Sequence, residues 1–186
     1  MANHLIIGLG GTGGKVLREL RKRVFEEFGS NTPGNNVHLE YIYLDSSKAD
    51  LEESNKWRVM GKHVGLAPAQ QVSTHGISAS MFQNINMYPG VECFLNKEEL
   101  NLFTSKLGSL ISEGIGGQRR RLGRVLLANN LADRSSNSDF LTRLKQTVQR
   151  ITANSGDNNG TFQMCAGLAG GTGSGSVVDV ISQIRN

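Results

Sequence analysis

Hydrophobic residues alternate along this chain between short continuous runs and longer stretches with helical spacing. Three continuous runs predict buried strands, at residues 4–9, 37–45 and 162–168. After the first run, apolar residues recur every three or four positions, which predicts a helix from Lys15 onward. The same spacing predicts further helices over residues 100–111, 122–126, 140–151 and 177–184.

Strands that alternate with helices predict an α/β fold. We expect a Rossmann-like, largely parallel sheet with helices on both faces, formed by residues 1–186 as one domain. Residues 52–95 lack sustained periodicity and contain scattered Pro, Gly, Asn and Ser, so they are predicted to form an irregular insertion. Loops at the carboxyl ends of parallel strands share one edge of the sheet, where ligands bind in such folds.

The loop after the last predicted strand is rich in glycine and hydroxyl side chains. Glycines let the backbone curl so that several N–H groups point inward, and the start of the following helix adds partial positive charge. This layout is typical of a site for a di- or triphosphate. Ser176 is predicted to be the N-cap of the helix that follows. The candidate phosphate-binding residues of this loop are Gly170, Gly171, Thr172, Gly173, Ser174, Gly175 and Ser176.

A second strand-to-helix loop of the same type stands at the start of the chain. Gly8, Gly10 and Gly13 satisfy the pattern G-x-G-x-x-G, which is a weak signal when it stands alone. Arg18, and Arg21 to Arg23, are predicted to form the solvated face of the following helix. The candidate phosphate-binding residues of this loop are Gly10, Gly11, Thr12, Gly13 and Gly14.

Two further segments are candidates for the same crevice. Asp45 and Ser46 end the second strand, and the acid is expected either to contact a ribose or metal ion or to cap the next helix. A third glycine loop is followed by three arginines, which either contact the distal phosphate of a ligand or form a solvated basic patch. The candidate residues of this third segment are Gly116, Gly117, Arg119 and Arg120.

Composition narrows the choice of partners only slightly. A net charge of +4 suits an anionic ligand but is too small to indicate binding to nucleic acid. The chain has 2 cysteines without metal-like spacing, which is typical of a reducing compartment. The sequence has no pattern of a signal peptide or a membrane span, so we expect a cytoplasmic protein without membrane partners.

Taken together, the loops resemble those of the tubulin/FtsZ superfamily. The segment 169–176, Ala-Gly-Gly-Thr-Gly-Ser-Gly-Ser, is similar to the signature G-G-G-T-G-[ST]-G. The segment 7–14 resembles the first phosphate loop of FtsZ, and 114–117 with 122–124 resembles the later loop that faces the terminal phosphate. Tyr43 to Asp45 occupy the place of the acidic loop after the second strand. The similarity extends over residues 4–185, with divergent bacterial tubulin-like proteins as the expected relatives.

This resemblance implies binding of GTP or GDP with Mg²⁺, and head-to-tail self-association around the nucleotide. It also implies that hydrolysis needs acids from a neighbouring subunit, so we expect this chain alone to bind nucleotide with negligible turnover. The chain departs from the family at Lys15, where FtsZ has an asparagine that helps read guanine, and at Arg119 to Arg121. Because the family continues beyond the signature helix, we expect these residues to be the N-terminal part of a larger domain.

Two other functions fit parts of the sequence. A dehydrogenase of the Rossmann type would use Gly8, Gly10 and Gly13 for NAD and Asp45 for its ribose. That reading leaves the loop at 170–176 unexplained, and Asp45 lies further along the chain than such an acid usually does. An interaction scaffold that keeps the fold without the nucleotide is the third possibility.

Overall fold

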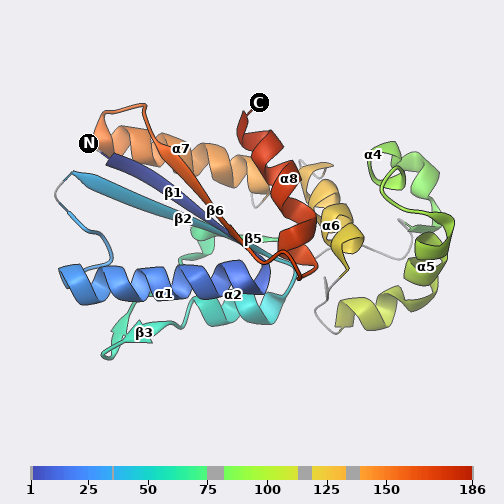
Figure 1. Cartoon of the computed structure of the whole chain (residues 1–186), viewed down its shortest axis with the longest axis horizontal. Coiled ribbons are helices and arrows are strands. Elements are labelled where there is room, and N and C mark those ends of the chain that lie inside the picture. Colours follow the sequence, from blue (N-terminus) through green and yellow to red (C-terminus); the bar gives the residue numbers. More distant parts are fainter. Residues whose placement is uncertain (1, 35, 75–81, 113–118, 133–138, 186) are drawn as a thin grey trace.

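The computed structural model describes residues 2–34, 36–74, 82–112, 119–132 and 139–185, and its centre is a parallel sheet (Figure 1). In the described part of the chain the sheet has four strands, in the order β5-β2-β1-β6, and all neighbouring pairs are parallel. The strands are β1 (Ala2–Leu9), β2 (Val37–Asp45), β5 (Gln71–Ser73) and β6 (Thr161–Ala166). This arrangement confirms the predicted Rossmann-like α/β fold.

Helices cover both faces of the sheet (Figure 1). One face packs against α1 (Gly10–Phe28), with α2 (Lys48–Ser54) beside it. The other face packs against α7 (Phe140–Ser155) and α8 (Thr172–Arg185). A further helix, α6 (Arg120–Ala132), packs against α8. The helices that precede it in the chain, α4 (Pro89–Glu92) and α5 (Lys97–Ser112), lie on the side of α6 that faces away from the sheet (Figure 1).

The continuous hydrophobic runs are explained by burial on both faces of a strand. Because side chains alternate along a strand, Leu5 and Ile7 join the core under α7 and α8. Ile6 points the other way, into the core that Tyr41 and Leu17 of α1 complete. A third cluster lies away from the sheet and includes Phe82, Phe103 and Leu126; we call it the satellite cluster.

The order of the strands fixes where a ligand site can form. From β1 the chain moves outward to β2 and β5, and it then returns to place β6 on the other side of β1. The helices that follow β1 and β6 therefore start from neighbouring strands and leave toward opposite faces. Ligands of open α/β sheets bind at such a reversal of strand order, beyond the carboxyl ends of the strands.

The stretch predicted to be irregular, residues 52–95, contains several short elements. It includes the end of α2, a hairpin of β3 (Arg58–Val59) and β4 (Lys62–His63), and the strand β5 of the main sheet. Two 3₁₀ turns, Pro68–Gln70 and Ile85–Met87, and the helix α4 complete its described part. β5 pairs with β2 over only three residues, too few for its alternation to be recognised in the sequence.

The contact between α6 and α8 is made without side chains at two points. A Cβ on Gly123 would overlap the carbonyl oxygen of Gly171, and a Cβ on Gly175 would overlap that of Arg120. Arg124 then ties the two helices together, with its Nε 2.8 Å and its Nη2 3.0 Å from the two carboxylate oxygens of Asp179. Close helix contact of this kind requires glycine, since any other residue would place Cβ inside the neighbouring backbone.

We therefore expect Gly123→Ala and Gly175→Ala to destabilise the protein. Overpacking at a tight contact costs about 1–3 kcal/mol, which exceeds the roughly 1 kcal/mol that alanine gains over glycine in a helix. Gly11→Ala is the control, because a Cβ at this position in α1 has no neighbour within 4 Å. Urea unfolding should give lower midpoints for the first two variants and an unchanged or higher midpoint for Gly11→Ala. Equal midpoints for all three would contradict the close contact.

Candidate functional site

The loops after β1, β2 and β6 contact one another at the reversal of strand order. Gly10 has a φ of 67°, and a Cβ on it would lie 2.9 Å from the backbone nitrogen of Gly173. A Cβ on Gly173 would lie 2.6 Å from the carbonyl oxygen of Leu9. The hydroxyl groups of Ser46 and Thr172 are 2.8 Å apart, which joins the loop after β2 to the start of α8.

Some glycines of the loops after β1 and β6 serve packing, while others border open space. A Cβ on Gly13 would lie 2.6 Å from the carbonyl oxygen of Cys165, and one on Gly14 would lie 2.6 Å from the ring of Tyr43. Gly11 has no atom within 4 Å of the position of a Cβ, and Gly170 has its nearest neighbour at 3.9 Å. The two open glycines thus mark where the backbone faces a ligand-sized space.

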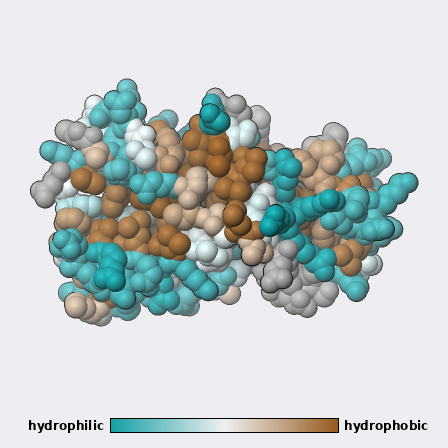
Figure 2. Space-filling model, viewed as in Figure 1, coloured by the Kyte–Doolittle hydropathy of each residue, from teal (hydrophilic) through white to brown (hydrophobic). Residues whose placement is uncertain are grey.

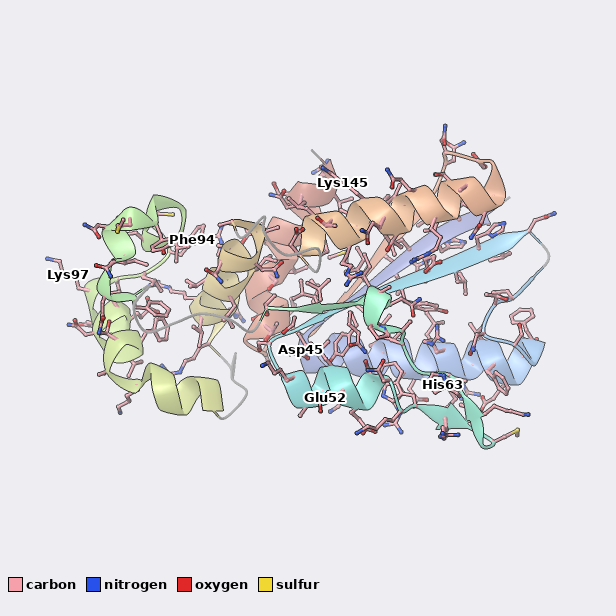
Figure 3. All side chains as sticks on the ribbon, turned by 180° about the vertical axis from the view of Figure 1, so that it is seen from behind. Asp45, Glu52, His63, Phe94, Lys97 and Lys145 are labelled. Atoms are coloured by element: carbon pink, nitrogen blue, oxygen red, sulfur yellow. The ribbon has the colours of Figure 1, made fainter. Side chains whose placement is uncertain are left out.

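That space is a cavity of about 560 Å³ beyond the carboxyl ends of β1, β2 and β6. Its volume falls within the roughly 300–1,000 Å³ typical of sites for small molecules and cofactors. Asp45 lies at its border where β2 ends and α2, which carries Glu52, begins (Figure 3). The cavity brings together ten of the residues predicted from the sequence, namely Gly10, Gly11, Thr12, Gly14, Asp45, Ser46, Gly170, Gly171, Thr172 and Gly173.

The remaining predicted residues of the signature segment lie elsewhere. α8 begins at Thr172, so Ser176 lies inside the helix, where it is fully buried, and its prediction as N-cap is wrong. The hydroxyl of Ser174 donates to the carbonyl oxygen of Gly170, and Gly175 packs against α6. The helix starts at Thr172, four residues earlier than the prediction of Ser176 as N-cap implied.

The third predicted loop is described only in part. Gly116 and Gly117 lie outside the described residues. Arg119 and Arg120 are exposed and do not border the cavity, and Nη2 of Arg120 donates to the carbonyl oxygen of Leu168 at 2.8 Å. Arg121 forms an ion pair with Glu99 at 2.6 Å. The described contacts of Arg120 and Arg121 are therefore made with the protein itself.

The cavity is also bordered by residues outside the predicted phosphate-binding set. Lys15 and Arg18 border it from α1, and Asp50, Glu53 and Trp57 border it from the segment that includes α2. Arg18 was assigned to a solvated face because the helix was expected to begin at Lys15. Since α1 begins at Gly10, residues 11, 14, 15 and 18 share one helical face, at spacings of three, four and seven. That spacing could have identified both cations.

Charges of both signs border the cavity, and its two cations lie on α1. No side chain caps the N-terminus of α1, so its first N–H groups keep their capacity to bind an anion. Lys15 and Arg18 take part in none of the ion pairs formed among the described residues. Positive charge from α1 is thus available at the cavity, which Asp50 and Glu53 also border.

Asp45 is held in place by hydrogen bonds to both of its carboxylate oxygens. The hydroxyl of Tyr43 donates to Oδ2 at 2.6 Å, and the backbone N–H of Ser47 donates to Oδ1 at 3.1 Å. Asp45 is only 3% exposed, and this burial raises its pKa above the usual range, although the two hydrogen bonds act in the opposite direction. Both oxygens are engaged within the protein, which gives no support to the NAD reading, in which this acid binds a ribose.

The described residues form neither a metal site of their own nor a membrane span. In residues 2–185, apart from the gaps given above, no three His, Cys, Asp or Glu side chains gather closely enough to hold a metal ion by themselves. Within the same segments, every helix is too short or too polar to pass through a lipid bilayer.

Comparison with known proteins complements this geometry. No curated protein and no solved structure matches the chain significantly. A family model described as tubulin-like matches residues 5–186, which is nearly the whole sequence and includes all three glycine loops. The chain therefore belongs to the tubulin-like family.

Proposed function

We propose that this chain is a nucleotide-binding domain that holds GTP or GDP in the cavity between α1 and α8 and couples this binding to self-association. The observation that carries the proposal is the convergence of two helix N-termini, those of α1 and α8, on one cavity bordered by open glycines. Membership of the tubulin-like family supports a nucleotide as the ligand.

The phosphates would lie against the two glycine loops. Backbone N–H groups near Gly11 and Gly171 would bind phosphate oxygens, and the hydroxyls of Thr12 and Thr172 lie on the same border. Each hydrogen bond to a charged group contributes about 1.5–3 kcal/mol, so a few such donors can hold a diphosphate. The preference for guanine rests on the family resemblance, because the described contacts do not identify a base.

The third loop would complete this site from the side of α6. Arg120 already contacts Leu168, in the loop after β6, so α6 lies close to the proposed phosphate site. We propose that nucleotide binding draws Arg119 and Arg120 toward the phosphates, and contact of Gly116 and Gly117 with the nucleotide stays a prediction.

Mg²⁺ fits this site as a partner of the nucleotide. The cation is commonly bound by one or two carboxylates together with phosphate oxygens and water, so a cluster of three acids is not required. Asp50 and Glu53 border the cavity and would supply a carboxylate. When bound, Mg²⁺ would neutralise phosphate charge that these acids would otherwise repel.

Self-association is supported by apolar side chains that the single chain leaves exposed. Brown, apolar groups gather over α8 and next to α1 in Figure 2. Large hydrophobic side chains of these elements that are 40–67% exposed are Val16 of α1, Phe162 of β6, and Val178 and Ile181 of α8. Association that covers such side chains is favourable at about 25 cal/mol for each Å² of apolar surface removed from water.

The open glycines provide a test of the proposed site. We expect Gly11→Val and Gly170→Val to fold normally, because a Cβ has space at both positions, and to lose most nucleotide binding because the new side chain occupies the cavity. Ala169→Val is the matched control, since Ala169 lies in the same loop and is exposed but does not border the cavity. Calorimetric titration with GTP and GDP should give at least a tenfold loss of affinity, which corresponds to about 1.4 kcal/mol, for the two glycine variants only. Retained affinity in folded Gly11→Val and Gly170→Val proteins would refute this location.

A second experiment tests the link to assembly. Sedimentation velocity of the chain at increasing concentration should show larger species with GTP and Mg²⁺ than without nucleotide. The folded Gly170→Val protein should stay at the size of the nucleotide-free chain, because it would no longer bind the ligand. If sedimentation did not depend on nucleotide while calorimetry detected binding, the coupling to self-association would be wrong and the binding site would stand.

A further inference from the structure

The hairpin of β3 and β4 presents a large apolar side chain to solvent at its tip. It projects from α1 on the side that faces away from the main sheet (Figure 1). Its turn consists of Met60 and Gly61, which have φ values of 48° and 75°. Positive φ at both central residues is the condition for a type I′ turn, in which Asn-Gly is a preferred pair. Met60 is 88% exposed, so packing within the chain does not account for a methionine at this position.

Methionine is an unusual residue for this turn in two respects. A residue other than glycine with positive φ is uncommon, and asparagine adopts this conformation more readily. An exposed apolar side chain also gains nothing from burial within the folded chain. Because Met60 favours neither the turn nor the core, its side chain is available for contact with a partner outside the chain.

The base of the hairpin is anchored, so the tip is held in a fixed position. The N–H of Val64 donates to the carbonyl oxygen of Trp57 at 2.9 Å, and both side chains belong to the core that α1 covers. Arg21 of α1 donates to the carbonyl oxygens of Val64 and Gly65. A tip on a base of this kind loses little conformational freedom when it binds a partner.

Cations surround the apolar tip. Lys56, Arg58 and Lys62 are exposed, and residues 54–66 contain no Asp or Glu. None of the three cations takes part in an ion pair among the described residues. Arg58 donates to the carbonyl oxygen of Gly61 at 3.2 Å, which keeps its guanidinium beside the turn. The positive charge of the hairpin is therefore available to an anionic partner.

We propose that this hairpin docks the chain on an anionic membrane surface, where Met60 inserts among the lipids while Lys56, Arg58 and Lys62 bind their headgroups. A convex tip fits a soft surface that yields to it, whereas a peptide is usually bound in a groove or along a sheet edge. Long cationic side chains suit this role, because their alkyl stems lie along apolar material while their charges stay among the headgroups.

This contact is compatible with the sequence analysis. The expectation of no membrane partner rested on the lack of a signal peptide and of a spanning pattern in the sequence. Docking from one side of the bilayer requires neither, because it combines shallow apolar insertion with attraction to anionic lipids.

The binding of a single hairpin is expected to be weak and to depend on salt. Each Lys or Arg close to an anionic membrane surface strengthens binding roughly fivefold, which corresponds to about 1 kcal/mol. This attraction falls off within a Debye length, about 8 Å at physiological ionic strength. Self-association would place several hairpins on one assembly and raise its affinity through multivalency. Only this last increase rests on the proposed function.

The tip is tested by a variant that should improve the turn. In cosedimentation, the chain should bind vesicles of phosphatidylcholine with added phosphatidylserine, and should not bind vesicles of phosphatidylcholine alone. Because Asn-Gly is a preferred pair for a type I′ turn, Met60→Asn should unfold at an equal or higher urea concentration. It should nevertheless bind the anionic vesicles several-fold more weakly, since the inserted side chain is lost. A structural role for Met60 would not combine these two results.

The cations are tested by two double variants with equal loss of charge. Lys56→Gln/Lys62→Gln removes two exposed cations of the hairpin and should weaken binding to the anionic vesicles roughly 25-fold. Lys97→Gln/Lys145→Gln is the control, because these exposed cations of α5 and α7 lie away from the hairpin, which His63 marks in Figure 3. The control should change the affinity by less than about threefold, since distant charges are screened.

The other outcomes overturn the inference. If the unmodified chain did not bind anionic vesicles, or if all variants bound them equally, the hairpin would not be a membrane-docking element. Loss of binding in Lys56→Gln/Lys62→Gln with unchanged binding in Met60→Asn would refute insertion of the tip. If the chain bound polyglutamate instead of vesicles, and the hairpin charge variant lost that binding, the partner would be an acidic polypeptide. Nucleotide binding would stand after any of these results.

Discussion

The candidate site depends on backbone-to-backbone contact between the two loops that follow β1 and β6. Gly10 and Gly173 approach so closely that a Cβ on either would lie within 3 Å of the backbone of the other loop. This contact brings the N-termini of α1 and α8 to the same cavity, where their partial positive charges add. A side chain at either position would push the two loops apart, so the N-termini of α1 and α8 would no longer border the same cavity. The glycines of the two loops are thus required for packing, in addition to the role proposed for them in nucleotide binding.

The fold and family could be predicted because they depend on features that are local in sequence. Strands such as residues 4–9 are continuous apolar runs, and the glycine loops directly follow two of them. The tubulin-like family and the parallel sheet, both predicted from these features, are confirmed. What failed was local detail at the loops. Glycines have low helix propensity, which hid the start of α1 at Gly10 and of α8 at Thr172, and Ser176 was misplaced as a result.

The composition of the cavity wall could be predicted only in part, because it depends on contacts distant in sequence. Arg18 looked like a member of a solvated face until the fold placed it on a cavity that Asp50 and Glu53 also border. The role of Tyr43, which supports Gly14 and donates to Asp45, required knowledge of how β2 lies under α1. The periodicity of a single segment does not show which residues of distant segments it contacts. The roles of Gly116 and Gly117 stay predictions.

The close contact of α6 with α8 also gives the chain a mechanical connection. Gly123 and Gly175 leave no space between the helices, and Arg124 joins Asp179 of α8 on one side while its guanidinium lies 3.7 Å from the centre of the Phe94 ring on the other. The start of α8 therefore cannot shift by much without displacing α6, whose residues Leu122 and Leu126 form part of the satellite cluster. A displacement of the start of α8 would therefore reach the satellite cluster through α6, a region remote from the cavity.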